Sequence, residues 1–98
     1  MKINYIVCPI RIVNKLASKH NIKAKETREV ILNKPRIRFA EKGNIKNNDV
    51  YGAFGQTKNG RYLSVFFIYK PENKTAIIIS AHDMSNKERK AYGKKKFK

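Results

Sequence analysis

Two histidines, five tyrosines and a large excess of basic residues are the groups in this 98-residue chain that could do chemistry. The 7 acidic residues are scattered and form no acid–base pair, and neither histidine belongs to a zinc-binding pattern. The sequence therefore predicts no metal site and no cofactor. It does suit RNA cleavage, because the 2′-hydroxyl of RNA is the nucleophile and the protein need supply only a base, an acid and positive charge.

Proton transfer or base stacking in such a site would fall to the histidines and tyrosines. Two arginines, Arg61 and Arg89, are placed to clamp a phosphate. The sequence alone also allows ordinary structural roles, since a helix-end histidine, a strand-end arginine and a core-edge tyrosine are common. The candidates for proton transfer or stacking are His20, His82, Tyr51, Tyr62 and Tyr92.

The net charge of +16 is the strongest property of the composition. A field of this size attracts polyanions, so the expected partners are nucleic acid or an acidic protein rather than a membrane surface. Leu, Ile, Val and Phe make up 25 of the 98 residues, which is enough for one small folded domain. The start of the chain lacks the apolar stretch of a secretory signal, so we expect a cytoplasmic protein in which Cys8 is a reduced, small hydrophobe.

The spacing of apolar residues predicts two helices in the first third of the chain. One covers residues 10–20 and ends at Asn21, after which Ile22 packs back. The other covers residues 24–32 and is stopped by Pro35. A very short joint separates them, so we expect a helix hairpin. The expected buried face of the first helix contains Ile10, Val13, Leu16, Ala17 and His20.

The middle of the chain changes to strand patterns. Residues 36–39 alternate arginine with apolar residues, which predicts a half-buried strand whose arginines face water. Further strands are expected at 50–57, 61–69 and 75–81, with a turn at Asn59-Gly60. A capping box of Ser85 and Glu88 opens a final helix. The predicted fold is α+β, with the helix hairpin on about four antiparallel strands, a single domain at 1–93 and a mobile basic tail at 94–98.

This topology locates a hypothetical site. If the 61–69 and 75–81 strands pair as a hairpin, the start of one lies opposite the end of the other. We therefore expect Arg61 and His82 to lie near each other at one sheet edge, with Arg89 and Tyr92 on the following helix. In this hypothesis the arginines stabilise charge on a phosphate, and His82 or Tyr92 moves a proton.

Residues 16–22 (LASKHNI) and Glu29-Val30 resemble two segments, Leu-x-x-Lys-His-Gly-Val/Ile and Glu-Val, of the BrnT family of toxins. Residues 55–57 and 60–67 resemble its Gly-Arg-Thr hairpin and hydrophobic strand. The C-terminal block is the most specific: residues 79–84 (ISAHDM), followed by Glu88-Arg89 and Tyr92, resemble the family's Ile-Ser-Ala-Arg and Glu-Arg-x-x-Tyr ending.

The resemblance covers about residues 9–92 and implies a RelE-like fold. It also implies metal-independent ribonuclease activity that inhibits growth, and a DNA-binding antitoxin encoded in the same operon. The site residues carried by this interpretation are Arg61, His82, Arg89 and Tyr92 for catalysis. Substrate contacts are expected from Lys19, His20, Tyr51, Lys94, Lys95 and Lys96.

The chain departs from the family pattern at three positions. His82 and Gln56 stand where arginine is common, and Val50 stands where an arginine commonly precedes the tyrosine matched by Tyr51. If those arginines hold the phosphate in other members, this chain has lost part of that clamp. The alternative function is a basic protein that binds RNA or DNA without cutting it.

Overall fold

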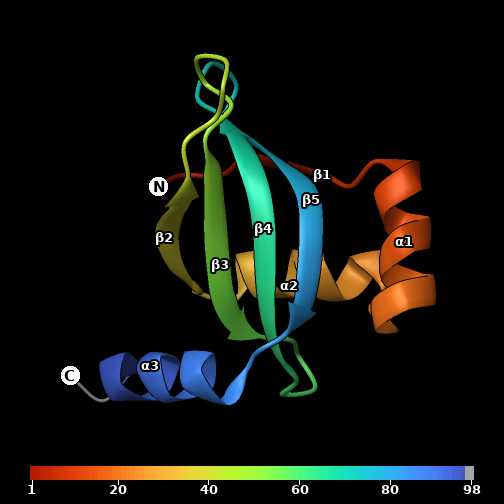
Figure 1. Cartoon of the computed structure of the whole chain (residues 1–98), viewed down its shortest axis with the longest axis vertical. Coiled ribbons are helices and arrows are strands. Elements are labelled where there is room, and N and C mark those ends of the chain that lie inside the picture. The colour runs from red at the N-terminus through yellow and green to blue at the C-terminus, as the bar shows by residue number, and fades with distance from the viewer. Residues whose placement is uncertain (97–98) are drawn as a thin grey trace.

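The computed structural model describes the backbone of residues 1–96 and the side chains of residues 1–93. The described residues form three helices and five strands in one small α+β unit, which is drawn in Figure 1. No helix in the described part of the chain is long and apolar enough to cross a membrane. The elements are β1 (Tyr5–Val7), α1 (Ile10–His20), α2 (Ala24–Leu32), β2 (Arg36–Glu41), β3 (Val50–Gln56), β4 (Tyr62–Lys70), β5 (Thr75–Asp83) and α3 (Asn86–Lys96).

The strands form one sheet in the order β1-β5-β4-β3-β2. The four strands β2 to β5 pair antiparallel with one another, as predicted, and β4 pairs with β5 along its length. The expectation of about four strands misses β1, which runs parallel to β5 from Tyr5 opposite Thr75. Three residues are too few to show a strand period, and their partner lies some 70 positions away in the chain.

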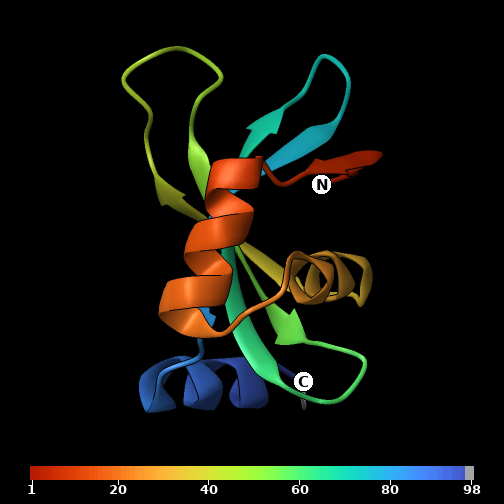
Figure 2. The ribbon, with the colours of Figure 1, turned by 90° about the vertical axis from the view of Figure 1, so that its right-hand side faces the viewer.

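The helices cover one face of the sheet, hereafter the helix face. In Figure 1, α1 runs beside β5 and α2 crosses behind the strands, and Figure 2 shows α1 in front of the strands with α2 beside it. Both helices contribute residues to one core cluster with β3, β4 and β5. Every second residue of β4 points into the core between sheet and helices. The core residues are Ile12, Leu16, Ile22, Val30, Ile31, Ala53, Leu63, Val65, Phe67, Ala76, Ile78 and Ala81.

The two helices form where the sequence predicts, but not as a hairpin of parallel axes. Asn21 ends α1 in the left-handed conformation at φ 53°, and Ile22 then packs back with no exposed surface. The chain turns there, so that α1 lies along the strands and α2 lies across them (Figure 1). Each helix thus packs mainly on the sheet.

The predicted buried face of α1 is partly wrong. Ile12 and Leu16 are buried, whereas Ile10 is 74% exposed. At 3.6 residues per turn, Ile12 and Leu16 lie one above the other, while Ile10 lies about 120° around the helix from Leu16. The buried face of α1 is therefore the one that carries Ile12 and Leu16, which belong to the core cluster that also contains Ile22.

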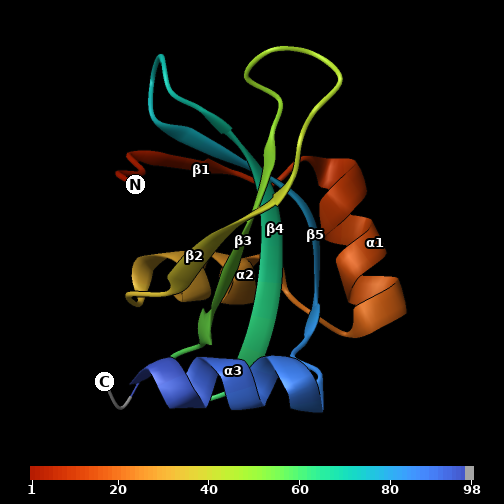
Figure 3. The ribbon, with the colours of Figure 1, turned by 60° about the vertical axis from the view of Figure 1, so that its left-hand side comes forward.

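The last helix crosses one end of the opposite face of the sheet, hereafter the open face (Figure 3). Its start matches the predicted capping box: the Ser85 N–H donates to Glu88 Oε1 at 2.8 Å, and the Glu88 N–H donates to Ser85 Oγ at 3.1 Å. The helix continues through Gly93 and includes Lys94, Lys95 and Lys96 of the predicted tail. The side chains of these three lysines, and residues 97–98, lie outside the described part.

Candidate functional site

Arg61 directly precedes β4, and four groups accept hydrogen bonds from its guanidinium: Asp83, Glu26 and the carbonyls of His20 and Asn21. The Nε and Nη2 atoms donate to both oxygens of Asp83 at 2.8 and 3.1 Å. The Nη1 atom donates to Glu26 Oε1 at 3.1 Å and to the carbonyl of Asn21 at 2.9 Å. Arg61 therefore joins the end of β5 to α2 and to the joint that follows α1.

The ionisation of this cluster is fixed by its own contacts. The hydrogen bond to Asp83 raises the pKa of Arg61, and the reciprocal bond lowers the pKa of the Asp83 carboxyl. Two carboxylates, Asp83 and Glu26, share one guanidinium, so the positive charge is already neutralised. Such an arginine stabilises the fold, and its N–H donors and its charge are already used by carboxylates of the protein and not by a phosphate.

The structure does not bring Arg61 and His82 together as the sequence interpretation expected. The hairpin itself is confirmed, with Leu63 opposite Asp83 and Ser64 opposite His82. Successive residues of a strand point to opposite faces, however. Arg61 meets Asp83 on the helix side, whereas His82 stacks on Phe66 on the open face.

Three predicted substrate contacts also lie away from the open face. Lys19 and His20 are exposed at the end of α1. Tyr51 packs against the core from the helix face, and its ring centroid lies 6.1 Å from that of Phe67. These three residues share no contact with His82 in the described structure.

Two cross-strand rows on the open face bring together a different set of residues. The antiparallel register places one residue from each of β2, β3, β4 and β5 side by side, on the face that alternates with the core residues Leu63, Val65 and Phe67. Each row starts with an arginine on β2. The first row is Arg36, Phe54, Ser64 and His82, and the second row is Arg38, Gly52, Phe66 and Ser80.

Glu88 of α3 holds the far end of the first row. Its Oε1 accepts hydrogen bonds from the Ser85 N–H and from the hydroxyl of the fully buried Ser64 at 3.1 Å, and lies 3.3 Å from Nε2 of His82. Partial burial raises the pKa of the Glu88 carboxyl, but the bonds from Ser85 and Ser64 and the charge of His82 outweigh this and lower it. The carboxylate is thus charged near neutral pH and orients the imidazole.

Aromatic contacts fix α3 against the sheet. The Arg89 guanidinium carbon lies 4.0 Å from the ring centroid of Tyr62, and the rings of Tyr62 and Tyr92 meet edge to face at 6.0 Å. Arg89 and Tyr92, both predicted site residues, therefore lie on the helix that carries Glu88. Their contacts position this helix.

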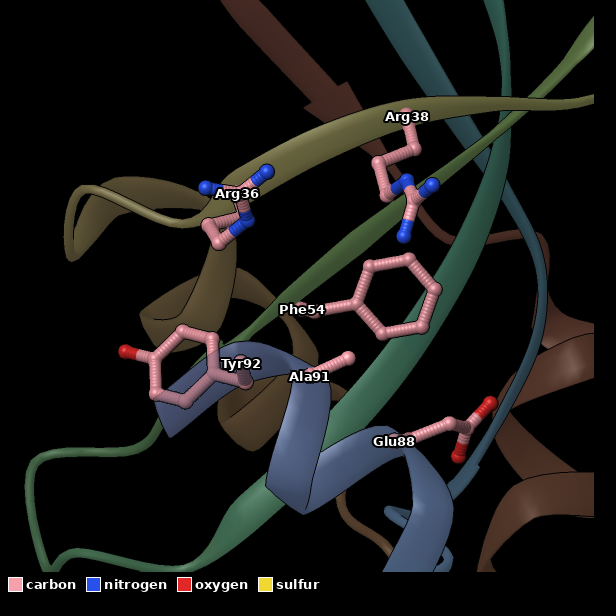
Figure 4. A pocket seen from close by; sticks show the side chains of 6 residues that line it. All are labelled: Arg36, Arg38, Phe54, Glu88, Ala91 and Tyr92. Carbon is pink, nitrogen blue, oxygen red and sulfur yellow. The ribbon is translucent and has the colours of Figure 1, made fainter. Parts of the chain in front are cut away.

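A small pocket of about 80 Å³ opens between β2 and α3, lined by Arg36, Arg38, Phe54, Glu88, Ala91 and Tyr92. Figure 4 shows the Arg38 guanidinium directed toward Phe54 and the pocket, and the Glu88 carboxylate turned away from both arginines. Small-molecule sites usually measure about 300–1,000 Å³. This pocket has room for a group such as a phosphate and not for a whole cofactor.

Arg36 and Arg38 differ from Arg61 in having no anionic partner among the described residues. Within the part of the chain that the structure describes, neither forms an ion pair or a hydrogen bond through its guanidinium. Arg36 is half-buried, and Arg38 is exposed. Two unneutralised guanidiniums beside a pocket are a ready site for an anion.

Sequence reasoning missed Arg36, Arg38 and Phe54 as functional candidates, and it treated Glu88 only as a helix cap. One signal was present: the alternation at residues 36–39 places both arginines on the strand face away from the core. The contact of Glu88 with Ser64 depends on where α3 crosses the sheet, for which the sequence carries no local signal.

The described residues contain no cluster of three or more His, Cys, Asp or Glu side chains that could hold a metal ion. The chain matches no model of a known protein family, and no curated protein is similar to it.

Proposed function

We propose that this protein is a metal-independent endoribonuclease that binds and cuts RNA on the open face of its sheet. The observation that carries the proposal is the first row: the unpaired Arg36 stands at one end, and His82, oriented by Glu88, stands at the other. Unneutralised cations bind a polyanion, and an oriented imidazole moves protons.

The proposed reaction is an internal transfer of the phosphoryl group. A base removes the proton of the 2′-hydroxyl, and the 2′-oxygen attacks the neighbouring phosphorus. The bond from phosphorus to the 5′-oxygen of the next nucleotide breaks, and this oxygen takes up a proton from an acid. The products are a 2′,3′-cyclic phosphate and a 5′-hydroxyl, so no oxidant, cofactor or metal is consumed.

In this proposal His82 transfers a proton at the scissile phosphate. Its side chain is 41% exposed, so substrate can reach it, and Glu88 fixes its orientation at Nε2. Glu88 is a positioning residue, because its carboxylate contacts Nε2 of the imidazole.

Arg36 and Arg38 bind RNA phosphates in the proposed complex and stabilise charge as it develops. Three strand spacings separate the backbones of Arg36 and His82, or about 14 Å. An RNA strand laid along the row therefore reaches both ends, with arginine at one phosphate and histidine near the next.

The biological role that we propose is that of a growth-inhibiting toxin with a cognate antitoxin. This part rests on the resemblance of residues 79–92 to BrnT toxins and on the net charge of +16, which favours an acidic partner. Within that block, Glu88 and the position of His82 take part in the proposed site.

The test of activity is incubation of the purified protein with end-labelled RNA in EDTA. We expect cleavage, 2′,3′-cyclic phosphate ends, and resistance of a substrate that carries a single 2′-deoxy substitution at the cut position. The variant His82→Gln should lose cleavage and still bind RNA. His20→Gln is the matched control, because His20 is the only other histidine and lies at the end of α1.

Two results would count against the proposal. Cleavage that disappears in EDTA would show a metal-dependent activity. Tight RNA binding without cleavage by pure protein would instead support the alternative of a non-catalytic RNA-binding protein.

A further inference from the structure

We propose that Phe54 and Phe66, together with His82, form a platform on which unpaired nucleobases stack, so that the RNA bound here is single-stranded. This inference rests on the proposed RNA-binding function and specifies its substrate class. The rings come from three adjacent strands. The Phe54 and Phe66 centroids are 6.1 Å apart at 88°, and those of Phe66 and His82 are 5.5 Å apart at 29°.

The pattern of large and small residues lifts these rings above the sheet. Phe66 stands between Gly52 on β3 and Ser80 on β5, and Phe54 stands beside Ser64. A Cβ atom at Gly52 would come within 2.9 Å of the Phe54 ring and 3.2 Å of the Phe66 ring. The absence of a side chain at Gly52 is therefore what allows both rings to lie over β3.

The platform stays accessible in the folded protein. Phe54, Phe66 and His82 are each half-buried, so part of every ring faces solvent. The two other helices lie on the opposite face, and α3 crosses only one end of the open face (Figure 3). Open aromatic rings on a sheet are costly to leave in water unless something stacks on them.

The charge beside the rings decides which ligand fits. Arg38 lies opposite Gly52 in the second row, with Phe66 on the next strand, and Arg36 lies opposite Phe54 in the first row. Aromatic faces beside unpaired cations match a single strand, whose bases stack while its phosphates meet the arginines. A duplex offers no free base faces, because its bases already stack on one another.

The test uses a 2′-O-methyl RNA oligonucleotide containing 2-aminopurine, whose fluorescence falls when the base stacks. This RNA has no free 2′-hydroxyl and cannot be cut by the proposed reaction, so binding is measured without catalysis. Wild-type protein should quench the fluorescence and bind the single strand more tightly than the duplex at the same salt concentration.

Phe66→Leu should abolish most of the quenching and weaken single-strand binding by about 5-fold or more, with duplex binding unchanged. Phe39→Leu is the matched control, since Phe39 is 59% exposed but alternates with Arg38 and so faces the helix side. Gly52→Ala is a second variant, which should displace the rings without removing one.

Equal affinity for single strand and duplex, or quenching that Phe66→Leu and Gly52→Ala leave unchanged, would overturn the platform. A thermal melt of each variant shows whether a loss of RNA binding is caused by unfolding. If one of the two variants unfolds, the other variant provides the test. Cleavage of unmodified RNA that persists without any stacking would reject the platform and leave the proposed ribonuclease intact. Stacking without cleavage would do the reverse.

Discussion

Arg61 and the pair Arg36 and Arg38 are arginines of one small domain in opposite electrostatic situations. Arg61 lies between two carboxylates and also donates to the carbonyl of Asn21. Arg36 and Arg38 line a pocket on the other face and meet no carboxylate among the described residues. The neutralised cation ties α2 to β5, whereas the unneutralised pair is left available to a ligand.

In this strongly basic chain, the arginine that stabilises the fold and the arginines available for binding are different residues. With 23 basic and 7 acidic residues, carboxylates are scarce, and two of them are placed on one arginine. A third, Glu88, serves His82. The guanidiniums of Arg36 and Arg38 therefore keep their positive charge, because no carboxylate of the described residues forms an ion pair with them.

The largest expected effect comes from removing the unpaired cations. Arg36→Ala combined with Arg38→Ala should lower the rate of RNA cleavage by about 100- to 1,000-fold, as expected for loss of electrostatic stabilisation at a phosphate. The thermal midpoint should hardly move, since neither guanidinium bonds to any residue that the structure describes. A large drop in that midpoint, with full activity per folded molecule, would mean that these arginines are structural.

Arg61→Ala should show the reverse behaviour. It leaves two carboxylates and a carbonyl without their donor, and we expect a loss of about 2–3 kcal/mol in the free energy of unfolding. In a domain of this size the thermal midpoint should fall by about 10–20 °C. This outcome differs from the sequence-based hypothesis, in which Arg61 stabilises charge on a phosphate.

The control for that experiment is Arg61→Lys, which keeps the charge and loses the two-pronged bond to Asp83. It should be intermediate in stability. Arg61→Ala protein that melts normally but no longer cuts RNA would return Arg61 to the site.

Salt dependence gives a smaller, additive test. Affinity for single-stranded RNA should fall steeply with salt, and the slope of log affinity against log salt changes by about 0.7 per phosphate contact. Arg36→Ala and Arg38→Ala should each reduce this slope by about 0.7. Lys19→Ala, at the exposed end of α1, serves as the control and should leave the slope unchanged.

The smallest expected effect is a dependence of stability on pH. The pKa values of Asp83 and Glu88 lie below their usual 3.8 and 4.5 in the folded protein. Their stabilising contribution is complete above those usual values and is lost as the pH falls below them, through the lower folded-state values. In urea melts, Arg61→Ala should lose less stability over this range than wild type, because Asp83 no longer has its cation.

Local patterns in the sequence were sufficient for most of the fold. The boundaries of α2, the left-handed Asn21 and the capping box of Ser85 and Glu88 depend on residues within a few positions of each other, so they could be predicted. The strand β1 could not, because three residues carry no period and its partner β5 is distant in the chain.

The candidate site was harder to predict for the same reason. The order of the strands is enough to place Arg61 and His82 at one end of the hairpin. The face on which each side chain lies depends on the register, and Asp83 and His82, which are adjacent in β5, point to opposite faces. The bulge in β5, between the partners of Phe66 and Phe67, further shifts that alternation. Neither property is written in a short motif.

NMR can test directly whether RNA binds to the open face of the sheet. Backbone amide and arginine side-chain signals of ¹⁵N-labelled protein would be followed while uncleavable 2′-O-methyl RNA is added. We expect the large shifts at Arg36, Arg38, Phe54, Phe66 and His82, with Arg61 nearly unchanged. Large shifts at Arg61, Lys19 and His20, with unchanged signals from the open face, would contradict RNA binding on the open face.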